Sequence, residues 1–264
     1  MANWANQECM PRIHNKPCRR RRQVLVCILF LCSALGCVAA APPTGAPRAA
    51  EQSHDATVHH SFADVDHWVT VFDDPGRDQW QRPAEVVRAL GLRPGMTVAD
   101  LGAGTGYFLR YLSPAVGETG TVLAVEPELN LLGYVRARIE REGESNVVPI
   151  LASLDTPRIP SGSTDLVLIV DTIHHLDDRL TYFRRLKRVL KPTGRIAVID
   201  WQKRELPEGP PAEHKIAREQ VIEEMTAAGY ALADEPDFLP YQYFLIFKPV
   251  PDLGGRQPTG APSP

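Results

Sequence analysis

The sequence has no cysteine after residue 37, although the chain is 264 residues long and all five of its cysteines lie before that point. The body of the protein therefore holds no disulfide framework, no thiolate zinc site and no cysteine nucleophile. We expect no metal site in it.

A basic surface is also missing from the body. Residues 1–41 carry six of the 29 Lys and Arg residues and one of the 32 acidic residues, which leaves 23 basic against 31 acidic side chains in the remainder. Nucleic-acid binding needs a basic footprint. The composition therefore excludes nucleic acid as an expected partner.

The first 41 residues form a leader. Four consecutive arginines at 19–22 precede an uncharged, mostly apolar run of 18 residues at 24–41, which ends in three alanines. This order is typical of a secretory signal, and the run is also just long enough to cross a bilayer. Residues 1–41 are therefore predicted to be a signal peptide or a membrane anchor. Ordinary cleavage after Ala41, lipoprotein-type cleavage at Cys37 and twin-arginine export all stay open.

The basic end of the leader predicts where the body lies. Basic residues before a span favour the cytoplasmic side, so we expect a periplasmic or otherwise extracytoplasmic protein, attached to the membrane through the N-terminal segment or a lipid. An anchored domain that faces the cytosol ranks lower. Proline-rich composition predicts a linker at 42–58 and a disordered tail at 249–264, on either side of one domain at 59–248.

Apolar runs alternate with amphipathic segments through this domain. The predicted helices cover 67–73, 83–90, 129–141, 179–190 and 217–228, with another that begins at 107. The predicted strands cover 97–101, 121–125, 147–151, 165–170 and 195–199, followed by two at 230–234 and 243–248 that pair antiparallel. The pattern predicts an α/β fold, a Rossmann-like doubly wound, mostly parallel seven-stranded sheet with an antiparallel last strand. Its ligand site is expected at the carboxyl ends of the strands.

A glycine loop follows the first predicted strand. The segment 100–106, DLGAGTG, has the spacing G-x-G-x-G, whereas a dinucleotide fingerprint needs glycine where Tyr107 stands. The carboxylate of Asp100 would repel a pyrophosphate and attract a cation. Glu126 ends the second strand, where an acid suits the hydroxyls of a ribose. A ligand with a cationic amino-acid end and a ribose is S-adenosylmethionine.

Four segments in register resemble the class I S-adenosylmethionine-dependent methyltransferases. They are VADLGAGTGYF at 98–108, Glu126, DLVLIVDTIHHL at 165–176 and LKRVLKPTGRIAVID at 186–200. The resemblance implies that Asp100 and the loop contact the methionine part, that Glu126 contacts the ribose, and that Ser153 or Asp155 contacts the adenine. Asp171 is either a cofactor contact or the cap of the next helix. The cofactor-binding residues implied are Asp100, Gly102, Ala103, Gly104, Gly106, Glu126, Ser153, Asp155 and Asp171.

Two histidines are the catalytic candidates. His174 and His175 follow the fourth strand, and a histidine there titrates near neutrality and can accept a proton from the methyl acceptor. The sequence does not separate one from the other, and structural hydrogen bonding is the competing interpretation.

Other polar and aromatic residues are candidates for the surroundings of the methyl acceptor. Asp200 and Trp201 are expected at the acceptor pocket. An N-terminal lid is interpreted as packing or positioning rather than chemistry; its residues are Trp68, Phe72, Trp80 and Gln81. Arg77, His59 and His60 either contact an anionic acceptor or a metal or lie on a solvated loop, and the solvated loop is the expectation.

Elimination narrows the class of molecule that can accept the methyl group. The chain has no Asn-Pro-Pro-Tyr-like tetrapeptide, which argues against methylation of bases or glutamine amides, and the missing cysteines argue against C5 methylation of pyrimidines and against arsenite methylation. A small acceptor of lipophilic character is left. Two alternatives to a methyltransferase stay open, namely a non-catalytic S-adenosylmethionine-binding module and a dinucleotide-dependent oxidoreductase.

Overall fold

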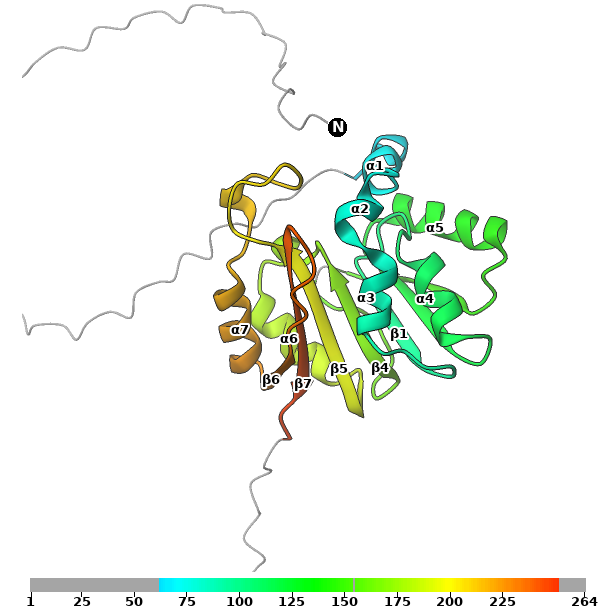
Figure 1. Ribbon diagram of the computed structural model, residues 1–264. Helices are drawn as coiled ribbons and strands as arrows, with labels where there is room; N and C mark the ends of the chain where they lie inside the picture. The colour runs from blue at the N-terminus through cyan, green and yellow to red at the C-terminus, as the bar shows by residue number, and fades with distance from the viewer. Residues whose placement is uncertain (1–61, 154, 252–264) are drawn as a thin grey trace, which may run out of the picture. The chain divides into compact units, whose positions relative to one another are not determined.

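Seven strands form one sheet in the order β3-β2-β1-β4-β5-β7-β6 (Figure 1). The computed structural model describes residues 62–153 and 155–251. The strands are β1 (Thr97–Leu101), β2 (Thr121–Glu126), β3 (Val147–Leu151), β4 (Thr164–Val170), β5 (Leu190–Trp201), β6 (Tyr230–Asp234) and β7 (Gln242–Pro249). The predicted leader and linker, and all but the first residues of the predicted tail, lie outside the described residues.

The direction of the strands confirms the predicted fold. β3, β2, β1, β4 and β5 are mutually parallel, and β7 pairs antiparallel with both β5 and β6. The strand order reverses between β1 and β4, which places the switch point of the sheet directly after the glycine loop. In open sheets of this kind, ligands bind outside the carboxyl ends of the strands at such a point.

Helices cover both faces of the sheet (Figure 1). The helices are α1 (Val65–Phe72), α2 (Arg77–Gln81), α3 (Pro83–Ala89), α4 (Leu109–Val116), α5 (Leu129–Glu142), α6 (Arg179–Lys187) and α7 (Arg218–Ala227), with short 3₁₀ turns η1 (Ile173–His175) and η2 (Ala212–His214). Apolar side chains of α6 and α7 pack with one face, and those of α3, α4 and α5 pack with the other. No helix among the described residues is long and apolar enough to cross a membrane.

Alternation along each strand decides which side chains share a face. In β1, Val98 packs on the α4 side and Ala99 and Leu101 on the α6 side. Asp100 comes between the last two, so period-2 alternation directs it to the α4 side together with Val98. Glu126 follows Ala124 on the same side of β2. The two acids thus lie on one face of neighbouring strands.

The helix predicted at 179–190 is too long. α6 ends at Lys187, and β5 already begins at Leu190, which pairs with Thr164 before a register shift. The predicted helix terminator at 191–194 therefore lies within β5. A Cβ at Gly194 would lie 2.9 Å from the carbonyl oxygen of Thr164, so a side chain there would prevent this close pairing.

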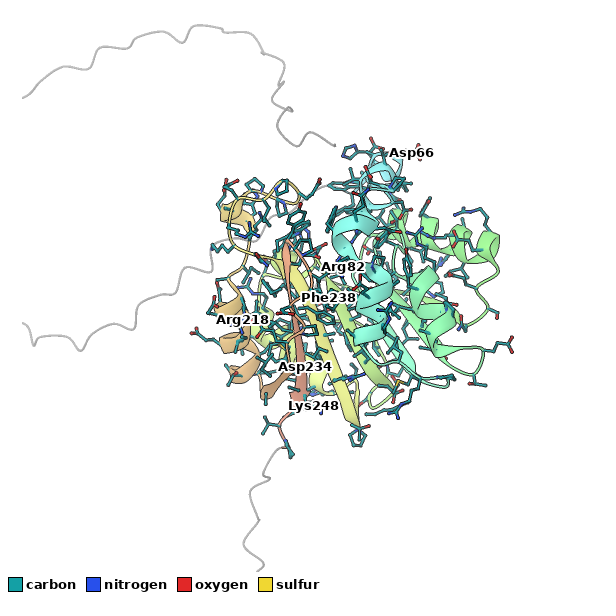
Figure 2. All side chains as sticks on the ribbon, viewed as in Figure 1. Asp66, Arg82, Arg218, Asp234, Phe238 and Lys248 are labelled. Atoms are coloured by element: carbon teal, nitrogen blue, oxygen red, sulfur yellow. The ribbon has the colours of Figure 1, made fainter. Side chains whose placement is uncertain are left out.

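α2 was not predicted, because its five residues show no apolar period that pattern analysis can detect. It ends at Arg82, which adopts a left-handed conformation (φ 48°) directly before the proline that begins α3. The Arg82 side chain donates to the carbonyl of Phe238 and stacks over its ring at 5.1 Å (Figure 2). The N-terminal helices are thereby attached to the segment that leads into β7.

The core on the α6 side gives a stability test. Phe183 is fully buried, whereas Arg184, the next residue of α6, is exposed. We expect Phe183→Ala to lower the free energy of unfolding by about 3–5 kcal/mol, because it removes apolar contacts and leaves a cavity. Arg184→Ala should change it by less than about 0.5 kcal/mol. Urea unfolding measures both, and a similar loss in the two variants would contradict the described packing.

Candidate active site

The glycine loop turns sharply between β1 and α4. Gly102, Gly104 and Gly106 have φ angles of 78°, 58° and 82°, which are left-handed values that favour glycine. The backbone N–H groups of Gly102 and Ala103 donate to the carbonyl of Val125 at 2.8 and 3.1 Å. These bonds hold the loop against the end of β2.

Gly102 is also constrained by a close contact. A Cβ there would lie 2.4 Å from Oγ1 of Thr172, the residue that precedes η1. Only a glycine lets the loop after β1 approach the segment after β4 this closely. The contact joins the predicted cofactor loop to the segment that carries both candidate histidines.

Two buried acids flank the loop. Asp100 and Glu126 are 3% and 4% exposed. Burial raises the pKa of Asp100 to about 7, against the opposing field of Arg77. Burial likewise raises the pKa of Glu126 to about 7, although its carboxylate accepts the N–H groups of Gly104 at 2.8 Å and Glu128 at 3.0 Å. Both acids are therefore poised to gain from a ligand that supplies positive charge or hydroxyl donors.

This arrangement fits S-adenosylmethionine on two grounds. The loop is a close-packed cradle in which a Cβ at Gly102 would collide with Thr172, and the described residues give neither buried acid an ion-pair partner, although the charge of Arg77 acts on Asp100. Asp100, Glu126 and the loop glycines would hold the amino-acid and ribose parts, as the resemblance implies. The structure brings these residues together as predicted.

An N-terminal strap, α1 and α2 with the turn between them (65–81), lies over the loop. Phe72 would lie 3.4 Å from a Cβ at Gly104, and Asp73 accepts the Thr105 hydroxyl at 2.9 Å. Arg138 of α5 reaches the same Asp73 carboxylate at 3.2 Å and the Thr105 carbonyl at 3.1 Å. The strap therefore packs directly on the glycine loop, and its function as a lid stays a prediction.

Arg77 lies on α2 and not on the solvated loop that the sequence suggested. Its guanidinium stacks 4.0 Å above the ring of Tyr107, and its side chain is 12% exposed. It donates to the carbonyl of Phe72 at 2.9 Å and to Oε1 of Gln81 at 3.2 and 3.3 Å. One signal for this position can be found in the sequence, because Arg77 and Gln81 are four residues apart and would share a helix face. The other residues named for that loop, His59 and His60, lie outside the described residues.

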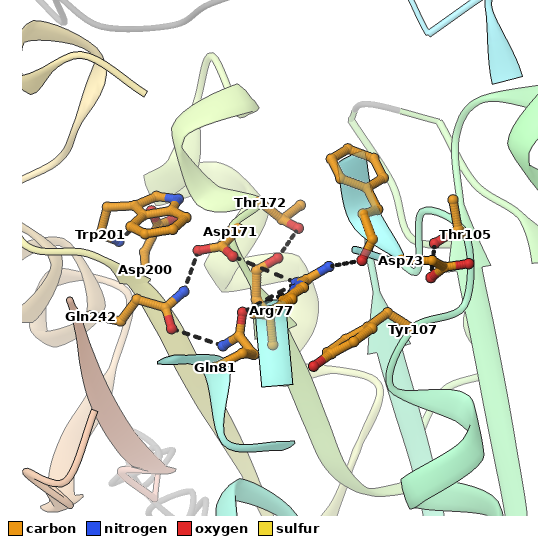
Figure 3. Close-up of polar contacts among 12 residues, drawn as sticks. Asp73, Arg77, Gln81, Thr105, Tyr107, Asp171, Thr172, Asp200, Trp201 and Gln242 are labelled. Atoms are coloured by element: carbon orange, nitrogen blue, oxygen red, sulfur yellow. Dashed lines mark hydrogen bonds and ion pairs between the residues drawn. The ribbon is translucent and has the colours of Figure 1, made fainter. Parts of the chain in front are cut away.

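Asp171 takes part in a closed ring of side chains (Figure 3). Gln81 donates to Gln242 at 2.7 Å, Gln242 donates to Asp171 at 2.6 Å, and the other oxygen of Asp171 lies 3.7 Å from Arg77. Burial and the nearby Asp200 raise the pKa of Asp171 to about 7. Asp171 itself has a φ of 51°. Sequence reasoning missed Gln242, which belongs to the last strand.

Ser153 and Asp155 form a small turn after β3. The Ser153 hydroxyl donates to Asp155 at 2.5 Å, and Asp155 lies 3.7 Å from Arg185 of α6 with its side chain 75% exposed. The hydrogen bond from Ser153 lowers the pKa of Asp155. Ala152, the residue before this turn, donates to the backbone carbonyl of Glu126 at 3.0 Å, which places the turn next to Glu126. Their role toward adenine stays a prediction.

The structure separates the two histidines. His174 is buried, and its Nδ1 lies 3.2 Å from both carboxylate oxygens of Asp200. Burial opposes the charged form of His174, but Asp200 and then Asp171 outweigh it and raise its pKa. His175 is half-buried, and its ring meets Phe62 edge-on at 5.9 Å, on the side of the strap.

Trp201 faces the strap, while Asp200 faces His174. The rings of Trp80 and Trp201 lie 5.0 Å apart, and Tyr241 lies 6.4 Å from Trp80. Gly209 packs flat against the indole of Trp201, since a Cβ there would lie 2.7 Å from it. An aromatic wall (Trp80, Trp201 and Tyr241) thus stands at the carboxyl end of β5 and the amino end of β7, beside the ring of side chains that contains Arg77.

Known proteins share this architecture. A family model described as a methyltransferase domain matches residues 99–198. The structure of an S-adenosylmethionine-dependent methyltransferase from Aquifex aeolicus is 31% identical, with a TM-score of 0.67, and the match covers 70% of this chain and 97% of that one. The chain belongs to the S-adenosylmethionine-dependent methyltransferases. Its cofactor is S-adenosylmethionine, and the alternative of a dinucleotide-dependent oxidoreductase is wrong.

Curated relatives of this methyltransferase match over part of their length. Demethylmenaquinone methyltransferase of Lactococcus lactis is 28% identical over 145 residues, which are 55% of this chain and 57% of that protein. The ubiquinone/menaquinone biosynthesis C-methyltransferase UbiE of a Shewanella species is 30% identical over 125 residues, 47% of this chain and 49% of that protein. The chain thus spans about half the length of these relatives.

The close contact at Gly102 predicts an effect on both binding and stability. Gly102→Ala should lower the free energy of unfolding by about 1–3 kcal/mol and abolish S-adenosylmethionine binding, because the new methyl group collides with Thr172. Gly133→Ala is the matched control, since that helical glycine has open space around it and should gain up to about 1 kcal/mol. Thermal unfolding and calorimetric titration measure the two effects, and normal binding by Gly102→Ala would contradict the described cradle.

The buried acids predict an unusual pH dependence. Between pH 3.8 and about 7 the folded protein keeps a proton on Asp100 that the unfolded chain has lost, so this group's contribution to stability falls as pH rises. Asp100→Asn should therefore be more stable than the wild type at pH 8 and equal to it near pH 3.8, while losing cofactor affinity.

A second aspartate provides the control for this pH test. Asp165, at the other end of the sheet, accepts the N–H of Thr97 at 2.8 Å and pairs with Lys191. Asp165→Asn should therefore lower stability at pH 8. Urea unfolding at both pH values measures the free energy of unfolding of each variant. If Asp100→Asn were less stable than the wild type at pH 8, the burial of a destabilising charge at Asp100 would be contradicted.

Proposed function

We propose that this protein is a methyltransferase that moves a methyl group from S-adenosylmethionine to a small, lipophilic acceptor outside the cytoplasm. The observation that carries the proposal is the glycine loop with Asp100 and Glu126 buried on one face beside it. Membership of the methyltransferase family supports the cofactor. The leader at 1–41, which lies outside the described residues, supports an extracytoplasmic, membrane-attached location.

The residues at the strand ends have distinct parts in this reaction. Bound S-adenosylmethionine supplies a methyl group on a positively charged sulfur, which is already activated toward an in-line displacement. Asp100, Glu126 and the loop backbone hold the cofactor, and the strap excludes water from it. When the acceptor carries a proton at the reacting atom, the histidine pair accepts that proton. His175 lies on the side of the strap, and His174 is positioned by its contact with Asp200.

The lipophilic character of the acceptor has two supports. The aromatic wall lies at the carboxyl end of β5 and the amino end of β7, where flat apolar groups can stack against it. The two relatives described above are named for methylation in quinone biosynthesis. A quinol-like ring on an apolar chain is therefore the first acceptor class to test.

The test uses methyl-labelled S-adenosylmethionine. The protein is incubated with the label and with a cell-envelope lipid extract or a reduced 1,4-naphthoquinone, and labelled products are separated by chromatography. We expect a labelled lipid-soluble product, at a rate that falls at least about 100-fold in Glu126→Gln, because the buried ribose contact is lost. Glu118→Gln, an exposed acid on the loop before β2, should leave the rate unchanged.

Two results would contradict the proposal. Failure of the wild-type protein to bind the cofactor would remove the methyltransferase reaction altogether. Tight binding with no labelled product from any envelope fraction would instead identify a binding module that senses the cofactor without transferring its methyl group.

A further inference from the structure

α6 carries a cluster of cations near its C-terminal end. Four of the five residues 184–188 are basic, and the arginines at 184, 185 and 188 are exposed. At about 100° per residue, these cations fall within an arc of about 160° of the helix surface, on the side away from the buried Phe183 and Leu186. The composition conceals this cluster, because the body as a whole holds more acids than bases.

The segment between β3 and β4 adds a fifth cation. The Ser161 hydroxyl donates to the carbonyl of Arg188 at 2.8 Å, so this segment lies against the end of α6. Arg158, in the same segment, is exposed and has a φ of 53°. Its charge acts together with that of Arg185 on the carboxylate of Asp155. We call the five cations the basic face, which consists of Arg158, Arg184, Arg185, Lys187 and Arg188.

Helix capping does not account for the basic face. Cations near the C-terminus of a helix interact favourably with the helix dipole, and the effect is confined to the last turn. Three cations lie in the last turn of α6, whereas those of α3 and α5 hold one each and those of α1, α4 and α7 hold none. Arg158 lies outside the helix altogether. The helices of this protein therefore do not need so much positive charge at their ends.

Two arginines of the basic face lack an acidic partner. Arg184 and Arg188 are four residues apart, where like charges destabilise a helix. Within residues 62–153 and 155–251, neither forms an ion pair, and Arg184 donates to the carbonyl of Ala227 at 3.4 Å. Arg185, by contrast, lies 3.7 Å from Asp155. The basic face thus favours an anion from outside the chain.

The acids of the same layer decide which kind of anion fits. α7 packs beside α6, and its exposed acids Glu219 and Glu223 lie in its first two turns, whereas its end beside Arg184 is uncharged. An extended nucleic acid would run from the basic face across these acids. Lipid headgroups are mobile and gather at the cations alone. The surface therefore fits a membrane with anionic headgroups better than it fits a nucleic acid.

We propose that the basic face docks this protein on the anionic headgroups of the membrane to which its leader attaches it. This inference rests on the membrane attachment within the proposed function. α6 covers a face of the sheet, whereas the cofactor site lies at the carboxyl ends of the strands, so docking does not cover that site (Figure 1). Each basic side chain near an anionic surface strengthens binding about fivefold.

Photoreactive lipids test which face of the protein meets the membrane. Full-length protein is reconstituted into nanodiscs that contain a lipid with a photoreactive headgroup, in a background of either anionic phosphatidylglycerol or zwitterionic phosphatidylcholine. Crosslinked peptides are then identified by mass spectrometry. We expect crosslinks across residues 179–188 in the anionic discs. They should be at least about 10-fold fewer in the zwitterionic discs or at about 1 M salt, where charges are screened beyond about 3 Å.

Paired double variants provide the matched comparison. Arg184→Gln with Arg188→Gln should lower the crosslinking of α6 in anionic discs at least about 10-fold, because two of the five cations are lost. Arg184→Lys with Arg188→Lys keeps the charge and should keep the crosslinks. Arg136→Gln with Arg141→Gln removes two exposed arginines of α5, on the other face of the sheet, and should change nothing. Thermal unfolding should show all three variants folded, since these positions are exposed.

Three results would overturn the inference. They are α6 crosslinks that persist in the glutamine variant, equal crosslinking in the two kinds of disc, and polyuridylate binding that the glutamine variant abolishes while α6 shows no lipid crosslink. Failure of the proposed attachment looks different. Full-length protein that is washed from both kinds of disc would contradict the attachment itself, whereas protein that stays on the discs without α6 crosslinks would contradict the docking alone.

Discussion

The burial of carboxylates at one edge of the sheet is the constraint on which the site depends. Asp100 and Glu126 are buried beside a loop in which a Cβ at Gly102 would collide with Thr172. Without a cationic ligand, their charge is offset by the field of Arg77 at Asp100 and by backbone N–H groups at Glu126. The protein thus holds two acids that keep a proton below about pH 7, whereas a cationic ligand would favour their charged form. The buried acids therefore lower the stability of the free protein, and ligand binding restores it.

The strap and the last strand belong to the same site, although they are far apart in the sequence. Gln81 and Gln242 are 161 residues apart and share a 2.7 Å hydrogen bond. The same strand pairs with β5 through Tyr243, which lies opposite Asp200, the partner of His174. The polar ring on one side of the sheet and the histidine–aspartate pair on the other are therefore positioned by one antiparallel pairing.

Much of the fold could be predicted from the sequence, because its strands are short apolar runs bounded by glycine or charged residues. β1 was predicted to the residue, and the antiparallel end of the sheet followed from two closely spaced runs. The end of α6 was not, since residues 188–190 (Arg-Val-Leu) continue the charged and apolar mixture of the helix, while tertiary pairing of Leu190 with Thr164 decides their conformation. The acids and glycines of the site were predictable because their role depends on the local turn. Arg77 and Gln242 were not, because they acquire their role only from partners distant in the sequence.

Translation order gives the Gln81–Gln242 hydrogen bond a consequence for biosynthesis. Residues emerge from the ribosome in sequence, so β1 to β5 can pair while β7 is still unmade. The polar ring around Arg77 then forms only when the final strand inserts between β5 and β6. A nascent chain that stops before residue 242 would hold the glycine loop and both acids, yet its strap would lack the anchor that fixes Arg77. The ring of side chains around Arg77 is therefore complete only in a chain that contains β7.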